Sequence, residues 1–158
     1  MRTNILIFLS LGVFICQAQE KKPSFEKVIE YYLFKSTSDR LFDTKENHAY
    51  IYSMGISFNT NGLIDTLYFS DRIDPEVRDI FMLDSRKVKL FKSITIPFKE
   101  YANKIVVLTF YHYNSKDGML DYSSGLLKQL EKLYPIINSS KPIVLYQPIV
   151  HGFIKHIN

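Results

Sequence analysis

Residues 50–70 carry the clearest structural signal of this 158-residue chain and read YIYSMGISFNTNGLIDTLYFS. In the first half of this stretch, large apolar side chains alternate with smaller ones, which is the period of a strand with one buried face. These large residues are Tyr50, Tyr52, Met54, Ile56 and Phe58. Asn61 and Gly62 favour a tight turn, and residues 63–70 supply a returning strand. The sequence therefore predicts a β-hairpin.

A helix and a buried strand are predicted after the hairpin. Asp74 suits a helix N-cap and Pro75 suits the first helical position, and residues 86–97 read as the second half of this helical region. The side chains that this helix would bury are Val77, Ile80 and Phe81. Residues 105–110 read IVVLTF and are apolar on both faces, which favours a strand covered on both sides. Together these elements form a ββαβ-like core with an antiparallel sheet.

Further elements are predicted on both sides of this core. Ser24 can cap an amphipathic helix, and residues 123–134 favour another helix. Residues 143–147 lie between two prolines, which suits a strand at a sheet edge. Residues 149–157 fit helical spacing slightly better than strand alternation. The predicted fold is a single small α+β domain, packed by helices, with an N-terminal helix and a C-terminal extension.

Residues 1–18 have the pattern of a cleaved signal peptide. Arg2 supplies a positive start, residues 5–15 are almost entirely apolar, and Ala18 ends a short run of residues typical of a cleavage site. Cleavage after Ala18 would leave residues 19–158 as the mature domain. We therefore expect an exported protein, either periplasmic or secreted.

The apolar stretch of the leader predicts no stable membrane span. It covers residues 5–15, whereas a membrane-spanning helix needs about 20 apolar residues. Cys16 ends this stretch and raises the alternative of a lipoprotein. The bulky Ile15 before it makes that alternative the less favoured one.

The composition supports a packed domain and narrows the choice of partners. Hydrophobic residues make up 46% of the chain and aromatic residues 15%, which excludes a disordered stalk. The single cysteine, Cys16, would leave with the signal peptide, so stability must come from a packed core without disulfides. The formal net charge is only +4, and export argues against a nucleic-acid partner. The sequence sets no oligomeric state.

The segment from about residue 49 to 113 resembles the TonB carboxyl-terminal domain. The matching features, in order, are a strand at 56–58, a polar-Gly hairpin at 61–64, a second strand at 67–70, a helix opened by Asp74, and a third strand at 105–110. The chain departs from the family because these 158 residues contain no long proline-rich span, and the aromatic-rich motif after the helix is not recognisable. The family's uncleaved membrane helix also has no counterpart here. The resemblance implies a small sheet in the cell envelope and peptide recognition by strand addition, but neither energy transduction nor any functional residue.

The candidate binding site consists of aromatic residues on two strands that are predicted to be neighbours. If the strands pair, Tyr50, Tyr52, Tyr111 and Tyr113 stand together as a platform of the kind that binds peptides or sugars, with core packing as the alternative. His112 lies between two of these tyrosines and belongs to the same candidate site. It is either a base in a cleft or, as the simpler expectation, part of a capped or solvent-exposed strand end.

No catalytic, cofactor or metal set is predicted. His151 and His156 are five residues apart and do not share a face on either a strand or a helix, so they form no ready metal pair. The chain also has a set of four basic residues close together, Arg86, Lys87, Lys89 and Lys92. This basic set either contacts an anionic lipid or polysaccharide or forms a solvated face.

Two functions from different classes are compatible with these patterns. The first is a non-enzymatic envelope protein that recognises a protein or peptide, with the partner adding a strand to the sheet. The alternative is a small secreted hydrolase that acts on envelope polymers, with His112 as base. The hydrolase requires His112 and a carboxylate to converge in a concave pocket.

Overall fold

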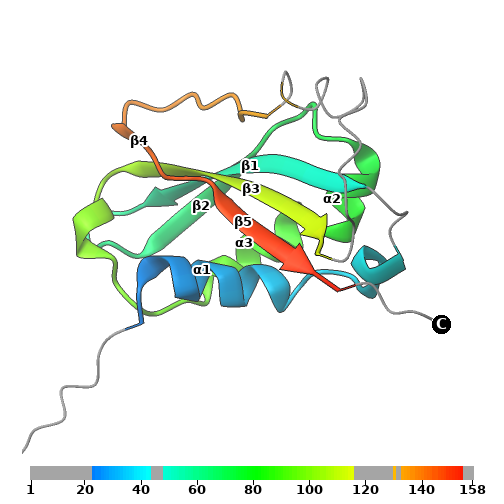
Figure 1. Ribbon diagram of the computed structural model, residues 1–158. Helices are drawn as coiled ribbons and strands as arrows, with labels where there is room; N and C mark the ends of the chain where they lie inside the picture. Colours follow the sequence, from blue (N-terminus) through cyan, green and yellow to red (C-terminus); the bar gives the residue numbers. More distant parts are fainter. Residues whose placement is uncertain (1–22, 44–47, 116–129, 131–132, 155–158) are drawn as a thin grey trace, which may run out of the picture.

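The computed structural model describes residues 23–43, 48–115, 130 and 133–154 (Figure 1). Within these ranges a five-stranded mixed sheet packs against helices, which confirms the predicted single α+β domain. The predicted signal peptide at residues 1–18 lies outside the described residues, as does most of the helix predicted at 123–134. No helix in the described ranges is both long and apolar enough to span a bilayer.

The hairpin and the buried strand form the antiparallel half of the sheet. β1 (Ala49–Phe58) pairs with β2 (Ile64–Phe69) on one side and with β3 (Ile105–Asn114) on the other. The register between β1 and β3 runs without a break from Ala49 opposite Tyr113 to Ser57 opposite Ile105. All four side chains at 105–108 are buried, which confirms the prediction of a strand covered on both faces.

The turn between β1 and β2 depends on one asparagine and one glycine. Asn59 Oδ1 accepts the N–H groups of Asn61 at 2.9 Å and of Leu63 at 3.1 Å. Gly62 has a φ of +77°, a conformation that residues with a Cβ rarely adopt. The Gly62 carbonyl accepts the N–H of Phe98 at 2.8 Å. The same glycine therefore closes the hairpin and holds the segment that leads to β3.

Two short strands extend the sheet in parallel along the other side of β3. β4 (Ile143–Leu145) confirms the predicted edge strand, and β5 (Ile149–Phe153) follows it after Pro148. The helical interpretation of residues 149–157 is wrong for this stretch, because β3 offers a complete ladder of backbone partners. Ile149 and Phe153 point into the core, while Val150 between them is exposed.

The helices lie on one side of the sheet (Figure 1). Each helix begins after a serine or aspartate whose side chain accepts a backbone N–H group of the first turn. Ser24 Oγ accepts from Lys27 at the start of α1 (Phe25–Phe34), and Asp74 accepts from Glu76 at the start of α2 (Pro75–Ile80). Asp84 caps α3 (Ser85–Lys92), so the helical region predicted up to residue 97 ends at Lys92. Short 3-10 turns occupy Asp39–Asp43 and Lys99–Tyr101.

The core fills the space between these helices and the sheet face that they cover, which we call the inner face. Alternate residues of the strands supply one layer of this core, as the periodicity of residues 50–58 predicts. The helices and the connections between them supply the other layer. Fully or nearly fully buried members include Ile29, Leu33, Tyr52, Met54, Ile56, Phe58, Ile80, Phe81, Leu83, Phe91, Leu108 and Phe110.

Residues 133–142 run across the opposite, outer face of the sheet (Figure 1). A Cβ built at Gly55 would lie 3.2 Å from Ile137 Cδ1, so this crossing is close over the middle of β1. Lys141 Nζ donates to Ser57 Oγ and to the Phe58 carbonyl, both at 2.8 Å, and lies 3.3 Å from an Asp65 carboxylate oxygen. The segment therefore covers the outer face over β1 and β2.

We expect Gly62→Ala to lower the free energy of unfolding by about 1–3 kcal/mol, because the left-handed backbone is strained for any residue with a Cβ. The new Cβ would also lie only 2.7 Å from the Phe98 carbonyl oxygen. Urea denaturation measures this loss. Thr60→Ala, at an exposed position of the same turn, is the control and should stay within about 0.5 kcal/mol of the wild type. A Gly62→Ala protein as stable as this control would contradict the role of the glycine.

Candidate functional site

The structure divides the predicted tyrosine platform between the two faces of the sheet. Tyr50 and Tyr52 of β1 are buried in the core on the inner face. Tyr111 and Tyr113 of β3 lie half-buried on the outer face, with their ring centroids 5.9 Å apart. The expectation of one four-tyrosine platform is therefore wrong. Successive residues of a strand point to opposite faces, so the tyrosines that flank His112 cannot share its side of the sheet.

His112 lies inside the core, where the simpler expectation placed an exposed strand end. Its ring is fully buried and stacks on Phe81, with 4.5 Å between centroids, and lies 5.7 Å from the ring of Tyr52. Neither ring nitrogen has a hydrogen-bond partner among the residues that the structure describes. Burial is the main reason that the pKa of His112 falls to about 3. The imidazole is therefore neutral at ordinary pH and has no contact with solvent through which it could act as a base.

His151 faces His112 from the neighbouring strand. The two residues are in register between β3 and β5, and their ring centroids are 6.0 Å apart. His151 is half-buried and its ring lies 4.1 Å from that of Phe34 at the end of α1. Burial lowers the pKa of His151, and the nearby Glu30 partly opposes this shift. His156, whose spacing from His151 predicts no metal pair, lies outside the described residues.

Lys87 is a third basic group in this part of the core. It was predicted to belong to an exposed basic set, but its side chain is buried beneath α1. The ammonium nitrogen donates to the Leu33 carbonyl at 3.0 Å and to Ser36 Oγ at 2.6 Å, where the end of the helix attracts a cation. Burial lowers the pKa of Lys87 to about 7, against an opposing effect of Asp84. Phe91 lies four residues further along α3 and is also buried, which is the sequence signal that could have placed Lys87 inside.

The rest of the predicted basic set is not a continuous charged surface. Arg86 pairs with Asp84 in its own turn, at 2.7 Å between the guanidinium and carboxylate. Lys89 and Lys92 are exposed. In the described ranges no three side chains of the metal-binding types gather into one group. These positions therefore offer neither a strong anion site nor a metal site.

The edge formed by β4 and β5, residues 143–154, has backbone groups that face away from the sheet. Three hydrogen bonds fix the phase of its pairing with β3: Ile105 N–H to Pro142 at 2.9 Å, Tyr146 N–H to Val107 at 2.9 Å, and Ser115 N–H to Phe153 at 2.8 Å. The N–H and C=O groups of one residue point to the same side, and those of the next residue point to the other side. The residues whose backbone groups therefore face the free side are Ile143, Leu145, Val150 and Gly152.

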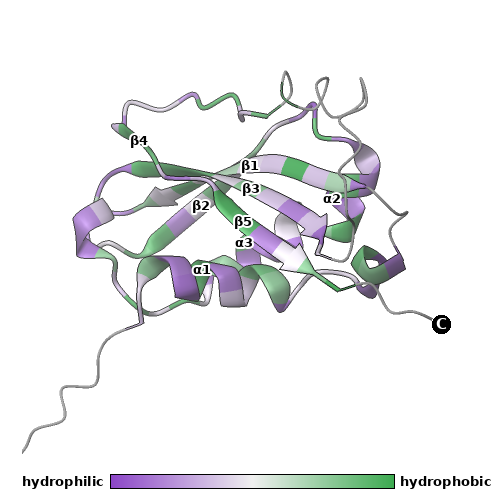
Figure 2. Cartoon of the chain, viewed as in Figure 1, coloured by the Kyte–Doolittle hydropathy of each residue, from purple (hydrophilic) through white to green (hydrophobic). Residues whose placement is uncertain are grey.

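The same alternation gives this edge an exposed apolar surface. The side chains that accompany the outward backbone groups project to the outer face, and the exposed fractions are 52% for Ile143, 71% for Leu145 and 61% for Val150. Ile154, which directly follows β5, is 58% exposed. Residues 142–154 contain no Asp, Glu, Lys or Arg. Figure 2 shows hydrophobic residues along β4 and at the beginning of β5. Natural proteins usually protect a free edge with charges or short irregular strands, and here Pro148 is the main interruption.

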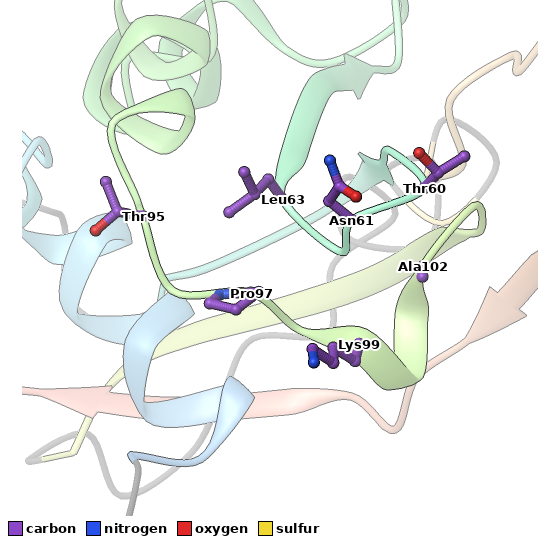
Figure 3. Close-up of a pocket in the computed structure, with 7 residues that line it drawn as sticks. All are labelled: Thr60, Asn61, Leu63, Thr95, Pro97, Lys99 and Ala102. Atoms are coloured by element: carbon purple, nitrogen blue, oxygen red, sulfur yellow. The ribbon is translucent and has the colours of Figure 1, made fainter.

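A shallow hollow of about 500 Å³ lies beside the hairpin turn (Figure 3). Its lining residues come from the turn and from the segment before β3, and are Thr60, Asn61, Leu63, Thr95, Pro97, Lys99 and Ala102. Hydroxyl, amide and ammonium groups are present, but neither a histidine nor a carboxylate lines it. The hollow therefore lacks the acid and base pair that the hydrolase alternative requires. The sequence does not indicate this hollow, because the turn and the segment before β3 that line it come together only in the folded chain.

Comparisons with protein-family models, with curated proteins and with solved structures find no match for this chain.

We expect the stability of the wild type to rise by on the order of 2 kcal/mol between pH 7 and pH 9 because of Lys87. Its pKa is about 7 in the fold and about 10.4 in the unfolded chain. In this window the unfolded state binds the extra proton, so a higher pH favours folding. Lys87→Met removes this titration and should flatten the profile, as measured by urea denaturation at both pH values. The exposed Lys89→Met is the control and should keep the wild-type slope; an unchanged slope in Lys87→Met would contradict the assignment.

Proposed function

We propose that this chain is an exported, non-enzymatic recognition protein of the cell envelope that binds an extended segment of a partner protein at the β4–β5 edge. The observation that carries this proposal is the combination of outward backbone groups and exposed apolar side chains at Ile143, Leu145 and Val150. An incoming strand would pair with the backbone groups, and its side chains would cover the apolar ones. The affinity would come mainly from these two contributions.

The outer face next to this edge supplies an aromatic surface for the partner. Tyr111 lies opposite Val150 in register, and Tyr113 lies opposite Gly152. A Cβ built at Gly152 would lie 3.4 Å from the ring of Tyr113, so this ring covers the position that lacks a side chain. Two of the five residues of the predicted binding site thus retain a role in the proposal, as part of a surface formed with β5.

The chemistry of the edge defines the partner segment. It should be extended, because only a strand can reach all the outward backbone groups, and it should carry apolar side chains at alternate positions. A charge at the centre of the segment would be buried against apolar side chains without a counter-ion, which is costly. The partner strand is therefore apolar on one face and uncharged in the middle.

Export is part of the proposal and is supported by the leader-like pattern of residues 1–18. A sheet that accepts a strand also agrees with what the resemblance to the TonB carboxyl-terminal domain implies. The hydrolase alternative has no support at His112, which is enclosed by aromatic rings and receives no hydrogen bond from a carboxylate among the described residues. Recognition, rather than catalysis, makes use of the chemistry that is accessible to solvent.

Peptides selected from a displayed library of random sequences on the immobilised protein test this proposal. We expect the selected peptides to alternate apolar residues, and we expect Leu145→Lys with Val150→Lys to weaken their binding at least tenfold. Both side chains are mostly exposed, so the double variant should fold. Ile136→Lys is the matched control, since Ile136 is 75% exposed and lies outside the edge.

Amide hydrogen exchange in the complex separates strand addition from contacts made by side chains alone. Strand addition should protect the amides of Leu145, Val150 and Gly152, which face the free side. The amides of His151 and Phe153 face β3 and should change little on binding. Peptides that bind without protecting the outward amides, or that bind Ile136→Lys as poorly as the double variant, would contradict the proposal.

A further inference from the structure

The core beneath β5 brings three basic groups together. His112 of β3 and His151 of β5 are in register, and the charge of Lys87 from α3 acts on His112. Both nitrogens of the buried His112 ring lack a hydrogen-bond partner among the described residues. A buried polar group without a partner is rare in folded proteins, and such groups often mark a strained or responsive position.

The groups that surround His112 contain little to stabilise a positive charge. From β5 it faces His151, from α3 Lys87, and from β1 the buried hydroxyl-bearing ring of Tyr52. It also meets the ring of Phe34 at the end of α1 and that of Phe81, which directly follows α2. Burial, His151 and Lys87, in that order, all lower the pKa of His112.

The nearest carboxylates interact with neighbours of His112 and not with His112 itself. Glu30 of α1 acts on His151. Glu76 of α2 lies 3.4 Å from the hydroxyl of Tyr50, which is in register with His112 but on β1. Asp84, before α3, acts on Lys87. None of these carboxylates offers His112 a hydrogen bond.

We propose that the register pair His112–His151 is an acid-operated release for β5, which detaches this strand from β3 while the β1–β2 hairpin stays folded. Detachment removes His151 and Phe153 from the inner face and leaves residues 110–114 of β3 without a paired strand on that side. Water then reaches both imidazoles. The consequence for binding rests on the proposed function, because a detached β5 can no longer accept a partner strand.

The sign of the effect follows from the two states of His112. In the attached state it takes a proton only near pH 3, whereas a hydrated histidine does so near pH 6.5. Below about pH 6.5 the detached state therefore binds more protons, and acid favours it. Between pH 6.5 and pH 4.5 His112 alone shifts the opening equilibrium about 50-fold, and His151 adds to this shift.

Hydrogen exchange on the free, full-length protein between pH 6.5 and pH 4.5 tests the release. The protection factors of the His151 and Phe153 amides, corrected for intrinsic exchange, should fall about 50-fold or more. Those of Gly55 and Tyr68, which are paired between β1 and β2, should fall much less. His112→Phe keeps an aromatic ring in the aromatic cage and should abolish most of the fall at β5. His48→Phe removes a histidine whose ring meets that of Tyr50 edge-to-face, and it serves as the control, which should keep the wild-type pH dependence.

Several outcomes would overturn the proposal. One is that β5 and the hairpin lose protection together, and another is that His112→Phe retains the full pH dependence. If His112→Phe does not fold, the imidazole resonances of the wild type decide: His112 should not titrate between pH 7 and pH 5, and titration near pH 6.5 within the intact fold would refute the release. No partner is present in this experiment, so a negative result leaves strand addition at neutral pH standing. Conversely, failure of the peptide test leaves the release intact.

Discussion

The antiparallel register between β1 and β3 determines the side of the sheet on which every side chain of interest lies. Tyr52 opposite Phe110, and Ile56 opposite Val106, place the heavy residues of both strands on the inner face. A slip of one residue would turn this whole set toward the outer face and the small residues toward the helices. The core, the burial of His112 and the exposure of its two neighbouring tyrosines all depend on this one alignment. The parallel strands β4 and β5 then take their own phase from β3.

Local patterns were sufficient for the parts of the fold that depend on local chemistry. The hairpin follows from strand periodicity and the Asn-Gly turn, and the starts of α1 and α2 follow from Ser24 and Asp74 as caps. The helix predicted for residues 149–153 is wrong because their apolar spacing fits a helix and a strand almost equally well. The strand forms because β3 offers its backbone a partner. The placement of Lys87 in an exposed basic set is also wrong. Its burial depends on α1 lying over α3, a contact between segments some fifty residues apart in the sequence.

The candidate site shows the same division. Strand alternation alone predicts that His112 and the two tyrosines beside it point to opposite faces of the sheet. The predicted site groups these three residues because they are adjacent in sequence. Of the β4–β5 edge, only the part formed by β4 was predicted as an edge strand, and the residues whose backbone groups face outward could be identified only from the hydrogen bonds that fix the phase of the ladder. Burying a lysine and a histidine that lacks a hydrogen-bond partner within the described ranges costs stability, and nothing in the local sequence signals that cost.

The separation along the chain between paired strands has a kinetic consequence. The hairpin closes across a few residues, while Ile56 must find Val106 and Tyr111 must find Val150. Isolated hairpins form in roughly 1–10 μs, whereas sheets built from distant segments assemble far more slowly. We therefore expect β3 to dock on a preformed hairpin and the C-terminal strands to join last, because they have no sheet to pair with until β3 is in place. A newly made chain would thus complete the β4–β5 edge only in the final step of folding, and incompletely folded molecules would lack the surface at which we propose that a partner strand binds.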